Sequence, residues 1–193
     1  MTPVELQKLV DAVKNILPAV IKEWNEIKLI QFETLYEQSF EQYFKNLQTQ
    51  EKTKRLSSIL DSIFARHIQA IIPEFRINEG NGRDYTYGVI DIESKITFGA
   101  GPGWTGNGYQ KTPWHLLLKF NQDRNGIITG QFAMIVDLSK CASKWTLPGK
   151  SGNFSGLTFL ADDEDKINII VGKMSNKTKK GRDNATYLTP IME

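Results

Sequence analysis

The chain contains one cysteine and two histidines in 193 residues. A single cysteine, Cys141, excludes an intramolecular disulfide, and two histidines beside it are too few for the usual zinc clusters. We interpret Cys141 as a small packed residue rather than a nucleophile. The composition therefore favours a reducing compartment, and we expect a cytoplasmic protein.

Long apolar runs and an excess of one charge are also missing. No N-terminal apolar segment and no long uninterrupted apolar stretch occurs, so we expect neither secretion nor a membrane span. The net charge is only +2, so any nucleic-acid surface must come from how the charges are distributed. With 40% hydrophobic residues the chain can bury one core, and we expect a single domain over residues 1–193.

Residues 1–73 predict a helical part, which precedes the rest of the domain at residues 74–193. The segment Thr2-Pro3-Val4-Glu5 is typical of a helix start with a capping box, and we expect Pro18 to end this first helix. A second, longer helix then runs to a connection at residues 48–54, and a third covers residues 56–71. The first two helices suit either a dimerisation surface or a layer that covers a sheet.

Residues 82–98, GRDYTYGVIDIESKITF, carry the most informative pattern. A turn at Gly88 is expected to join two strands, and the second strand bears Asp91, Glu93 and Lys95 at alternate positions. Period-two spacing places these three side chains on one face, which must look into solvent, a cleft or a ligand. The opposite face is apolar enough to pack on a core: Ile90, Ile92, Ser94 and Ile96.

The charged face of this strand has two interpretations. Two or three carboxylates that converge on one point can hold a hard divalent cation, and Mg²⁺ binds through one or two of them together with water and substrate phosphate. An ammonium beside that ion then has a chemical role. The alternative is an ordinary amphipathic strand whose polar face is solvated.

Asp84, an eight-residue gap and then Glu93-Ser94-Lys95 resemble the PD-(D/E)xK nuclease motif, with Arg83 in place of the proline. The surroundings are similar to type II restriction endonucleases of the PvuII and EcoRV kind: N-terminal helices, an acidic hairpin, a polar loop and further strands. The resemblance covers residues 84–120, and its motif is short. It implies an α/β fold of the restriction-endonuclease type, with a mixed central β-sheet flanked by helices behind an N-terminal helical region.

The resemblance also implies a site. Asp84 and Glu93 would bind Mg²⁺ with help from the backbone carbonyl of Ser94, and Lys95 would orient or help to deprotonate the attacking water. Asp91 has three open roles, as an alternative ligand, as an acid behind the ligands, or as a partner of Lys95. In related nucleases a helix acid can join the metal site, and the second helix offers three glutamates that are otherwise ordinary exposed side chains: Glu33, Glu37 and Glu41.

The glycine-rich segment at residues 99–112 follows this strand directly and contains five glycines. In the resemblance such a loop enters a DNA groove, where amide, hydroxyl and lysine side chains read base edges. The alternatives are a flexible linker or a phosphate cradle, although the order GxxxxGK[ST] is missing. The candidates for base reading are Asn107, Gln110, Lys111 and Thr112, and those for stacking or phosphate contact are Trp104 and Tyr109.

Two strands are expected next, at residues 113–120 and 127–138. In the first, His115 could touch substrate or make an interior hydrogen bond, and Lys119 is a candidate for a phosphate contact. The long loop at residues 139–156 offers further groups to DNA: Lys140, Lys144, Trp145, Lys150, Asn153 and Ser155.

The end of the chain combines an acidic turn with a basic run. Residues 157–160 and 167–171 predict a hairpin, and the acids of residues 161–165 suit its solvated turn better than a metal site. Residues 166–182 contain six basic residues and no acid. Such a run either grips phosphates nonspecifically or forms a solvated tail.

These patterns and the resemblance together predict a type II restriction endonuclease, an Mg²⁺-dependent hydrolase of double-stranded DNA. We expect a homodimer whose two-fold symmetry matches a short palindrome. The resemblance further implies 5′-phosphate ends, a prokaryotic setting and a cognate DNA methyltransferase in the same system. Two alternatives stay open: a structure-selective or repair nuclease of the same fold, and a non-catalytic DNA-binding protein.

Overall fold

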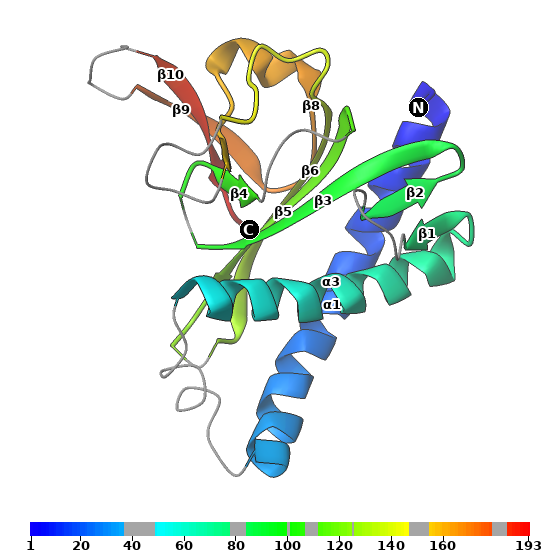
Figure 1. Ribbon diagram of the computed structural model, residues 1–193, viewed down its shortest axis with the longest axis vertical. Helices are drawn as coiled ribbons and strands as arrows, with labels where there is room; N and C mark the ends of the chain where they lie inside the picture. The colour runs from blue at the N-terminus through cyan, green and yellow to red at the C-terminus, as the bar shows by residue number, and fades with distance from the viewer. Residues whose placement is uncertain are drawn as a thin grey trace.

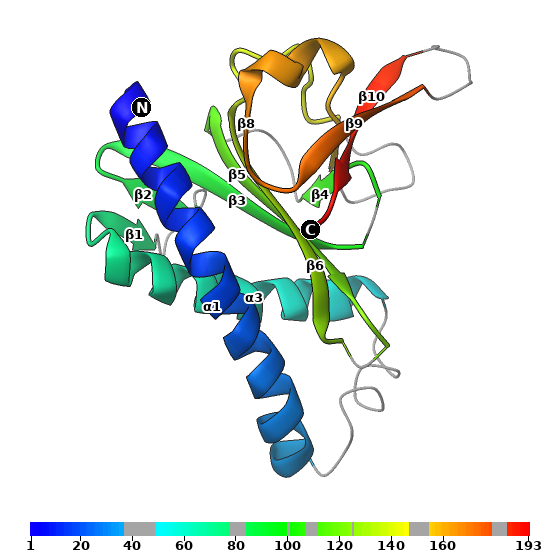
Figure 2. The same ribbon diagram turned by 180° about the vertical axis from the view of Figure 1, so that it is seen from behind.

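The structure is a computed structural model that describes residues 1–36, 49–77, 84–99, 101–106, 112–124, 126–146, 155–178 and 185–193. Two crossing helices, α1 (Pro3–Tyr36) and α3 (Thr49–Ile71), lie on one side of a central sheet, and smaller strand pairs lie on the other (Figures 1 and 2). The chain is thus mixed α/β with an N-terminal helical part, as predicted. Within the described residues, neither helix combines the length and the apolar character needed to span a membrane.

The first helix begins as the sequence predicts. The Thr2 hydroxyl accepts the Glu5 N–H at 3.2 Å, and the Glu5 carboxylate accepts the Thr2 N–H at 2.7 Å, which is a capping box. The expectation that Pro18 ends this helix is wrong, because α1 continues through it. Pro18 is exposed, so water can reach the carbonyl that lacks its N–H partner, while Leu17 and Val20 keep the apolar stripe in the core.

The third expected helix is longer than predicted. α3 begins at Thr49, so residues 49–54 are helical rather than a connection. Four of these six residues are glutamine, glutamate or lysine, which are good helix formers and extend a helix that packing fixes further along the chain. Three acids considered for the metal site lie outside the part of the chain whose side chains are described: Glu33, Glu37 and Glu41.

Polar contacts fasten the helices to each other and to the sheet. Glu23 on α1 accepts hydrogen bonds from Arg66 and, at 2.8 Å, from His67 Nε2, both on α3. Asn25 Oδ1 accepts the backbone N–H of Ile128 at 2.9 Å, at the start of a central strand. His67 therefore has a packing role between the two helices.

The central sheet has six strands in the order β1 (Phe75–Ile77), β2 (Tyr85–Tyr87), β3 (Ile90–Phe98), β5 (Trp114–Gln122), β6 (Ile128–Asp137) and β8 (Ile167–Val171). β3 and β5 are parallel, and the other neighbours are antiparallel, so the sheet is mixed as predicted. The turn between β2 and β3 uses Gly88, whose φ of 61° a glycine adopts without strain. The predicted hairpin is therefore confirmed.

Both faces of the sheet are covered by apolar side chains. The helices pack on one face in a core that includes Trp24, Phe64, Ile92, Leu116 and Phe120. The other face carries the pairs β4 (Trp104–Gly106) with β7 (Ser155–Leu157) and β9 (Lys173–Thr178) with β10 (Thr186–Ile191). Its core includes Trp104, Leu117, Phe132, Leu157 and Phe159. Strand β5 is therefore buried on both sides, since neighbouring residues point to opposite faces.

The hairpin expected from residues 157–160 and 167–171 does not form. β7 pairs with β4, β8 pairs with β6, and a 3-10 helix, η1 (Ala161–Lys166), separates them. The acidic turn is also not wholly solvated. Asp163 is fully buried and accepts the backbone N–H groups of Ala142 at 2.7 Å and Ser143 at 2.9 Å. These bonds fasten the loop that begins at residue 139.

Candidate active site

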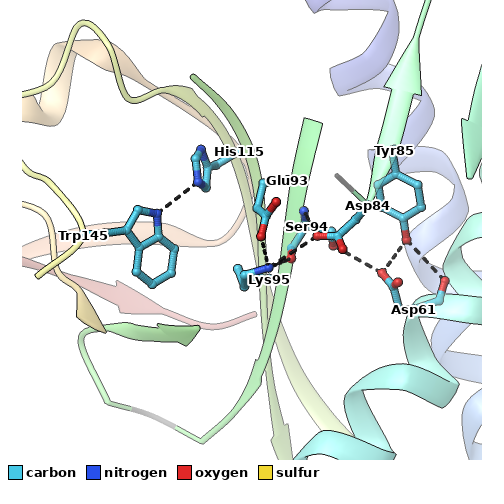
Figure 3. A network of polar contacts seen from close by, with 8 residues as sticks. All are labelled: Asp61, Asp84, Tyr85, Glu93, Ser94, Lys95, His115 and Trp145. Carbon is cyan, nitrogen blue, oxygen red and sulfur yellow. Dashed lines mark hydrogen bonds and ion pairs between the residues drawn. The ribbon is translucent and has the colours of Figure 1, made fainter. Parts of the chain in front are cut away.

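The β2–β3 hairpin brings Asp84 alongside the charged strand. Asp84 directly precedes β2, and because Tyr85 is paired with Ile92, Asp84 lies beside Glu93 and Ser94. The Asp84 Oδ2 atom accepts the Ser94 backbone N–H at 2.7 Å (Figure 3). The eight-residue gap between Asp84 and Glu93 is therefore the length that this tight hairpin needs to place the two carboxylates side by side.

The Lys95 ammonium lies at the centre of this group. Its Nζ atom is 2.5 Å from Glu93 Oε1 and 2.8 Å from the Ser94 carbonyl oxygen. It is also 3.4 Å from Asp84 Oδ2. The structure therefore brings together the four groups that the motif predicts, namely two carboxylates, one carbonyl and one amine (Figure 3).

Burial differs across the group. The exposed fraction of the side chain is 38% for Asp84, 20% for Lys95 and 9% for Glu93, so the group is open to solvent at Asp84. The second oxygen of Glu93, Oε2, is buried and has no hydrogen-bond partner among the described residues. A buried carboxylate oxygen without a partner is costly, which points to a ligand that the described residues do not supply.

The oxygen donors of this group suit Mg²⁺. Carboxylate and carbonyl oxygens are hard ligands, and Mg²⁺ needs only one or two carboxylates beside water. In the described part of the chain no three His, Cys, Asp or Glu residues are grouped to hold a metal. An ion here would rest on Asp84, Glu93, the Ser94 carbonyl and water, and the unpartnered Glu93 Oε2 atom fits that role.

Asp91, two residues before Glu93 on β3, is half-buried. Its backbone carbonyl accepts a hydrogen bond of 2.7 Å from the Thr112 hydroxyl. Thr112 is itself buried, so the expectation that it reads a base edge does not fit this structure, and its hydroxyl instead ties the chain ahead of β5 to β3. The role of the Asp91 carboxylate stays a prediction.

An acid that the sequence analysis missed supports the site from the helix side. Asp61 on α3 accepts hydrogen bonds from the Tyr85 hydroxyl and, at 3.3 Å, from the Ser94 hydroxyl (Figure 3). Burial raises the pKa of the Asp61 carboxyl, and the Tyr85 hydrogen bond only partly opposes this effect. A signal was present, because helical spacing puts Asp61 on the same face as Ala65 and Ile68, which are both buried.

His115 pairs with Glu93 in the sheet but is sealed from solvent. The Trp145 indole N–H donates to His115 Nε2 at 3.0 Å (Figure 3). His115 Nδ1 lies 3.3 Å from the Pro113 carbonyl oxygen. Burial lowers the pKa of His115 to about 4, so the ring is neutral at pH 7, with its proton on Nδ1. Two roles were considered for His115. Contact with substrate does not fit its burial, and the interior hydrogen bond is the role that the structure supports.

Trp104 and Lys119 are buried as well, so the expectation that they contact DNA is wrong. The glycine-rich segment folds back on the sheet as β4, and the Lys119 ammonium donates to the carbonyls of Gly101 and, at 2.8 Å, Gly103. It also lies 4.6 Å from the centre of the Trp104 ring. Burial lowers the pKa of Lys119 to about 8. A Cβ atom at Gly103 would lie 2.9 Å from the backbone carbonyl oxygen of Leu157, so this approach requires glycine.

The remaining candidates for DNA contact divide into two groups. Lys140 and Lys144 are exposed residues, although the Lys144 ammonium donates to the carbonyls of Leu138 and Cys141. Lys140 lies 3.5 Å from an oxygen of Asp137. The others fall outside the described residues, so their predicted roles stay predictions: Asn107, Tyr109, Gln110, Lys111, Lys150 and Asn153.

Comparisons with known proteins add little to this geometry. No protein-family model matches the chain, and a search of curated proteins found no similar sequence. One solved structure, "XiaF from Streptomyces sp. in complex with FADH2 and Glycerol", aligns at 12% identity with a TM-score of 0.20. The match covers 79% of this chain and 46% of that one. A TM-score this low carries no argument about fold or function.

Proposed function

We propose that the chain is an Mg²⁺-dependent endonuclease that hydrolyses phosphodiester bonds in double-stranded DNA. The observation that supports this proposal is the convergence of Asp84, Glu93, the Ser94 carbonyl and Lys95 at one partly open point. Two acids, a carbonyl and an amine at this spacing are the functional groups of the PD-(D/E)xK motif. The mixed sheet that carries them agrees with a restriction-endonuclease-like fold, which we propose here as the finer description.

The all-oxygen site has a defined chemical use in such an enzyme. When bound, Mg²⁺ makes a water molecule more acidic and stabilises the charge that develops on the phosphate oxygens. Asp84 and Glu93 would hold it, with the Ser94 carbonyl as a neutral third ligand. Asp61 would keep that ligand in place, because its carboxylate accepts the Ser94 hydroxyl and the Tyr85 hydroxyl, both on the hairpin.

The amine of Lys95 would act on the attacking water and on the phosphate. In the proposed reaction a water oxygen bonds to phosphorus and the bond from phosphorus to O3′ breaks. One water proton goes to solvent or a nearby base, and the leaving oxygen takes up a proton as a 3′-hydroxyl. The other fragment keeps a 5′-phosphate. An ammonium placed beside the reacting phosphate offsets the negative charge that accumulates there.

Sequence specificity and dimer formation complete the proposal. A type II restriction endonuclease acts as a homodimer on a short palindrome, because two-fold protein symmetry then matches two-fold DNA symmetry. The side chains proposed to read bases are Asn107, Gln110 and Lys111. They belong to the segment that connects β4 to β5, and this segment begins and ends close to the acidic strand, because β4 contacts β3 and β5 pairs with it.

Digestion of a plasmid of known sequence, followed by mapping of the ends, tests the proposal. We expect fragments with fixed ends in Mg²⁺, none in EDTA, and none from Glu93→Ala or Lys95→Ala. Glu26→Ala, which removes an exposed acid on α1, is the matched control and should cut like the wild type. Cleavage without a fixed sequence would support a structure-selective nuclease instead, and DNA binding without any cleavage would support a non-catalytic DNA-binding protein.

A further inference from the structure

The ammonium of Lys95 occupies the oxygens that the proposed function assigns to a metal ion. Its three contacts are Glu93 Oε1, the Ser94 carbonyl oxygen and Asp84 Oδ2, one from each expected ligand (Figure 3). A lysine ammonium has three N–H donors and no acceptor. All three donors therefore have an oxygen of the candidate cation site within reach, so the chain supplies its own cation there.

A divalent ion and this ammonium compete for the same oxygens. Lys95 Nζ donates a charge-assisted hydrogen bond to Glu93 Oε1, so this oxygen already contacts a positive charge. Mg²⁺ binds oxygen at about 2.0–2.1 Å in near-octahedral geometry. An ion that close to Glu93 Oε1 and the Ser94 carbonyl would stand next to the ammonium, and the two positive charges would repel each other strongly in this half-buried place.

The second oxygen of Glu93 is free of the ammonium. Glu93 Oε2 is buried without a hydrogen-bond partner among the described residues, whereas Oε1 of the same carboxylate holds Lys95. The Asp84 side chain is 38% exposed, so an incoming ion can meet this carboxylate first and gain the buried Glu93 Oε2 atom as the lysine leaves. The Lys95 side chain has a flexible four-carbon stem and is 20% exposed, so its ammonium can move toward solvent on the open side of the site.

We propose that Lys95 is the resident cation of this site, and that a divalent metal ion binds by displacing its ammonium from Glu93, Ser94 and Asp84. This inference rests on the metal site of the proposed function and adds how the binding of the metal ion to that site is regulated. The event that loads the ion also releases the lysine, which is then available to a phosphate or a water molecule. Two carboxylates and one ammonium carry a net charge of −1, and a divalent ion changes this to +1, which attracts the DNA backbone.

Calorimetric titration with Ca²⁺ in the absence of DNA tests the exchange. Lys95→Met removes the competing cation and should bind Ca²⁺ about tenfold tighter or more than the wild type, because a unit charge in contact with the site no longer opposes the ion. Glu93→Gln should lose binding. Lys22→Met, which removes an exposed lysine on α1, is the matched control for net charge and should bind like the wild type. If Lys95→Met binds Ca²⁺ no tighter than Lys22→Met, the exchange is wrong.

Chemical modification of the wild-type protein supplies a second test that needs no folded variant. Acetic anhydride labels lysine amines, and mass spectrometry follows the rate at Lys95 with Lys22 as internal reference. We expect Ca²⁺ to speed the labelling of Lys95 and to leave Lys22 unchanged, and an unchanged or slower rate at Lys95 would overturn the proposal. Both tests are independent of cleavage. If Ca²⁺ displaces Lys95 but the protein cleaves no DNA, only the proposed nuclease function is wrong. If the protein cleaves DNA while Lys95 stays protected from labelling, only the proposed exchange is wrong.

Discussion

Replacing Asp163 tests how the long loop beside the site is held. The Asp163 carboxylate is fully buried, and it accepts the N–H groups of Ala142 at 2.7 Å and Ser143 at 2.9 Å. Asp163→Ala leaves both donors without an acceptor, at a cost of about 1–3 kcal/mol each. Removing a buried charge offsets part of this cost, and the loop can admit water. We therefore expect the free energy of unfolding to fall by about 2–3 kcal/mol.

The pH dependence of this effect follows from the same contacts. Burial alone would raise the pKa of Asp163, but hydrogen bonds from Ser143 and the Ala142 N–H, with help from Lys166, outweigh it and hold the pKa below its ordinary value. A lowered pKa in the folded state stabilises the fold above the unfolded pKa of about 4. That stabilisation is lost as the pH falls through the folded pKa. The difference between wild type and Asp163→Ala should therefore shrink in acid.

Urea denaturation at several pH values measures both quantities. Asp162→Ala, in the same 3-10 helix but exposed, is the control and should change the free energy of unfolding by less than about 0.5 kcal/mol. Trp145 lies in the loop that Asp163 fastens, so its fluorescence reports local loosening. An Asp163→Ala variant as stable as the control, or a difference from wild type that persists unchanged below pH 3, would refute this account of the loop.

Three further predictions concern single residues. Glu93→Ala should bind a short duplex more tightly than wild type in EDTA, because one negative charge near the phosphate is gone; fluorescence anisotropy measures this, and weaker binding would contradict it. Pro18→Ala should raise the free energy of unfolding by about 1–3 kcal/mol, since alanine restores a helix hydrogen bond on an exposed face. Urea denaturation measures this quantity, and a lower free energy of unfolding than that of the wild type would contradict the prediction. Gly172→Ala should lose more stability than Gly88→Ala: both have positive φ, but only at Gly172 does a Cβ atom clash, at 2.6 Å from the Ile191 carbonyl oxygen. Equal midpoints for the two variants would argue against that clash.

The hairpin with the acidic strand could be predicted because its signals are local. Gly88 marks a two-residue turn, and alternation sets which side chains share a face. Together they fix the register between β2 and β3, which places Asp84 next to Glu93. The sequence therefore indicated the convergence of these groups with Lys95, whereas their catalytic roles stay predictions.

The burial of Lys119, on the sheet face opposite the helices, could not be predicted from local signals of this kind. Lys119 follows three leucines in its strand, yet its charge suggested contact with solvent or phosphate. The glycine-rich segment covers Lys119, and its carbonyls at Gly101 and Gly103 accept hydrogen bonds from the ammonium. This contact joins residues from different elements, and no periodic pattern within either element encodes it.

Pro18 and Asp61 show two further limits of reading a sequence locally. A proline breaks a helix by its intrinsic propensity, but the packing of Leu17 and Val20 on the core outweighs that preference. Asp61 lies on a buried helix face, where an acid is unexpected unless it has partners. Those partners, Tyr85 and Ser94, lie on the hairpin and become neighbours only in the folded chain.

The single-turnover rate of DNA cleavage in Mg²⁺, measured on a plasmid for wild type, Glu93→Ala, Lys95→Ala and the Glu26→Ala control, tests the central claim most directly. The account predicts cleavage by wild type and control, with both site variants folded by circular dichroism and slower by at least about a hundredfold. Site variants that cut at the wild-type rate would contradict it, as would a folded wild-type protein that binds Ca²⁺ at this site yet leaves every DNA substrate intact.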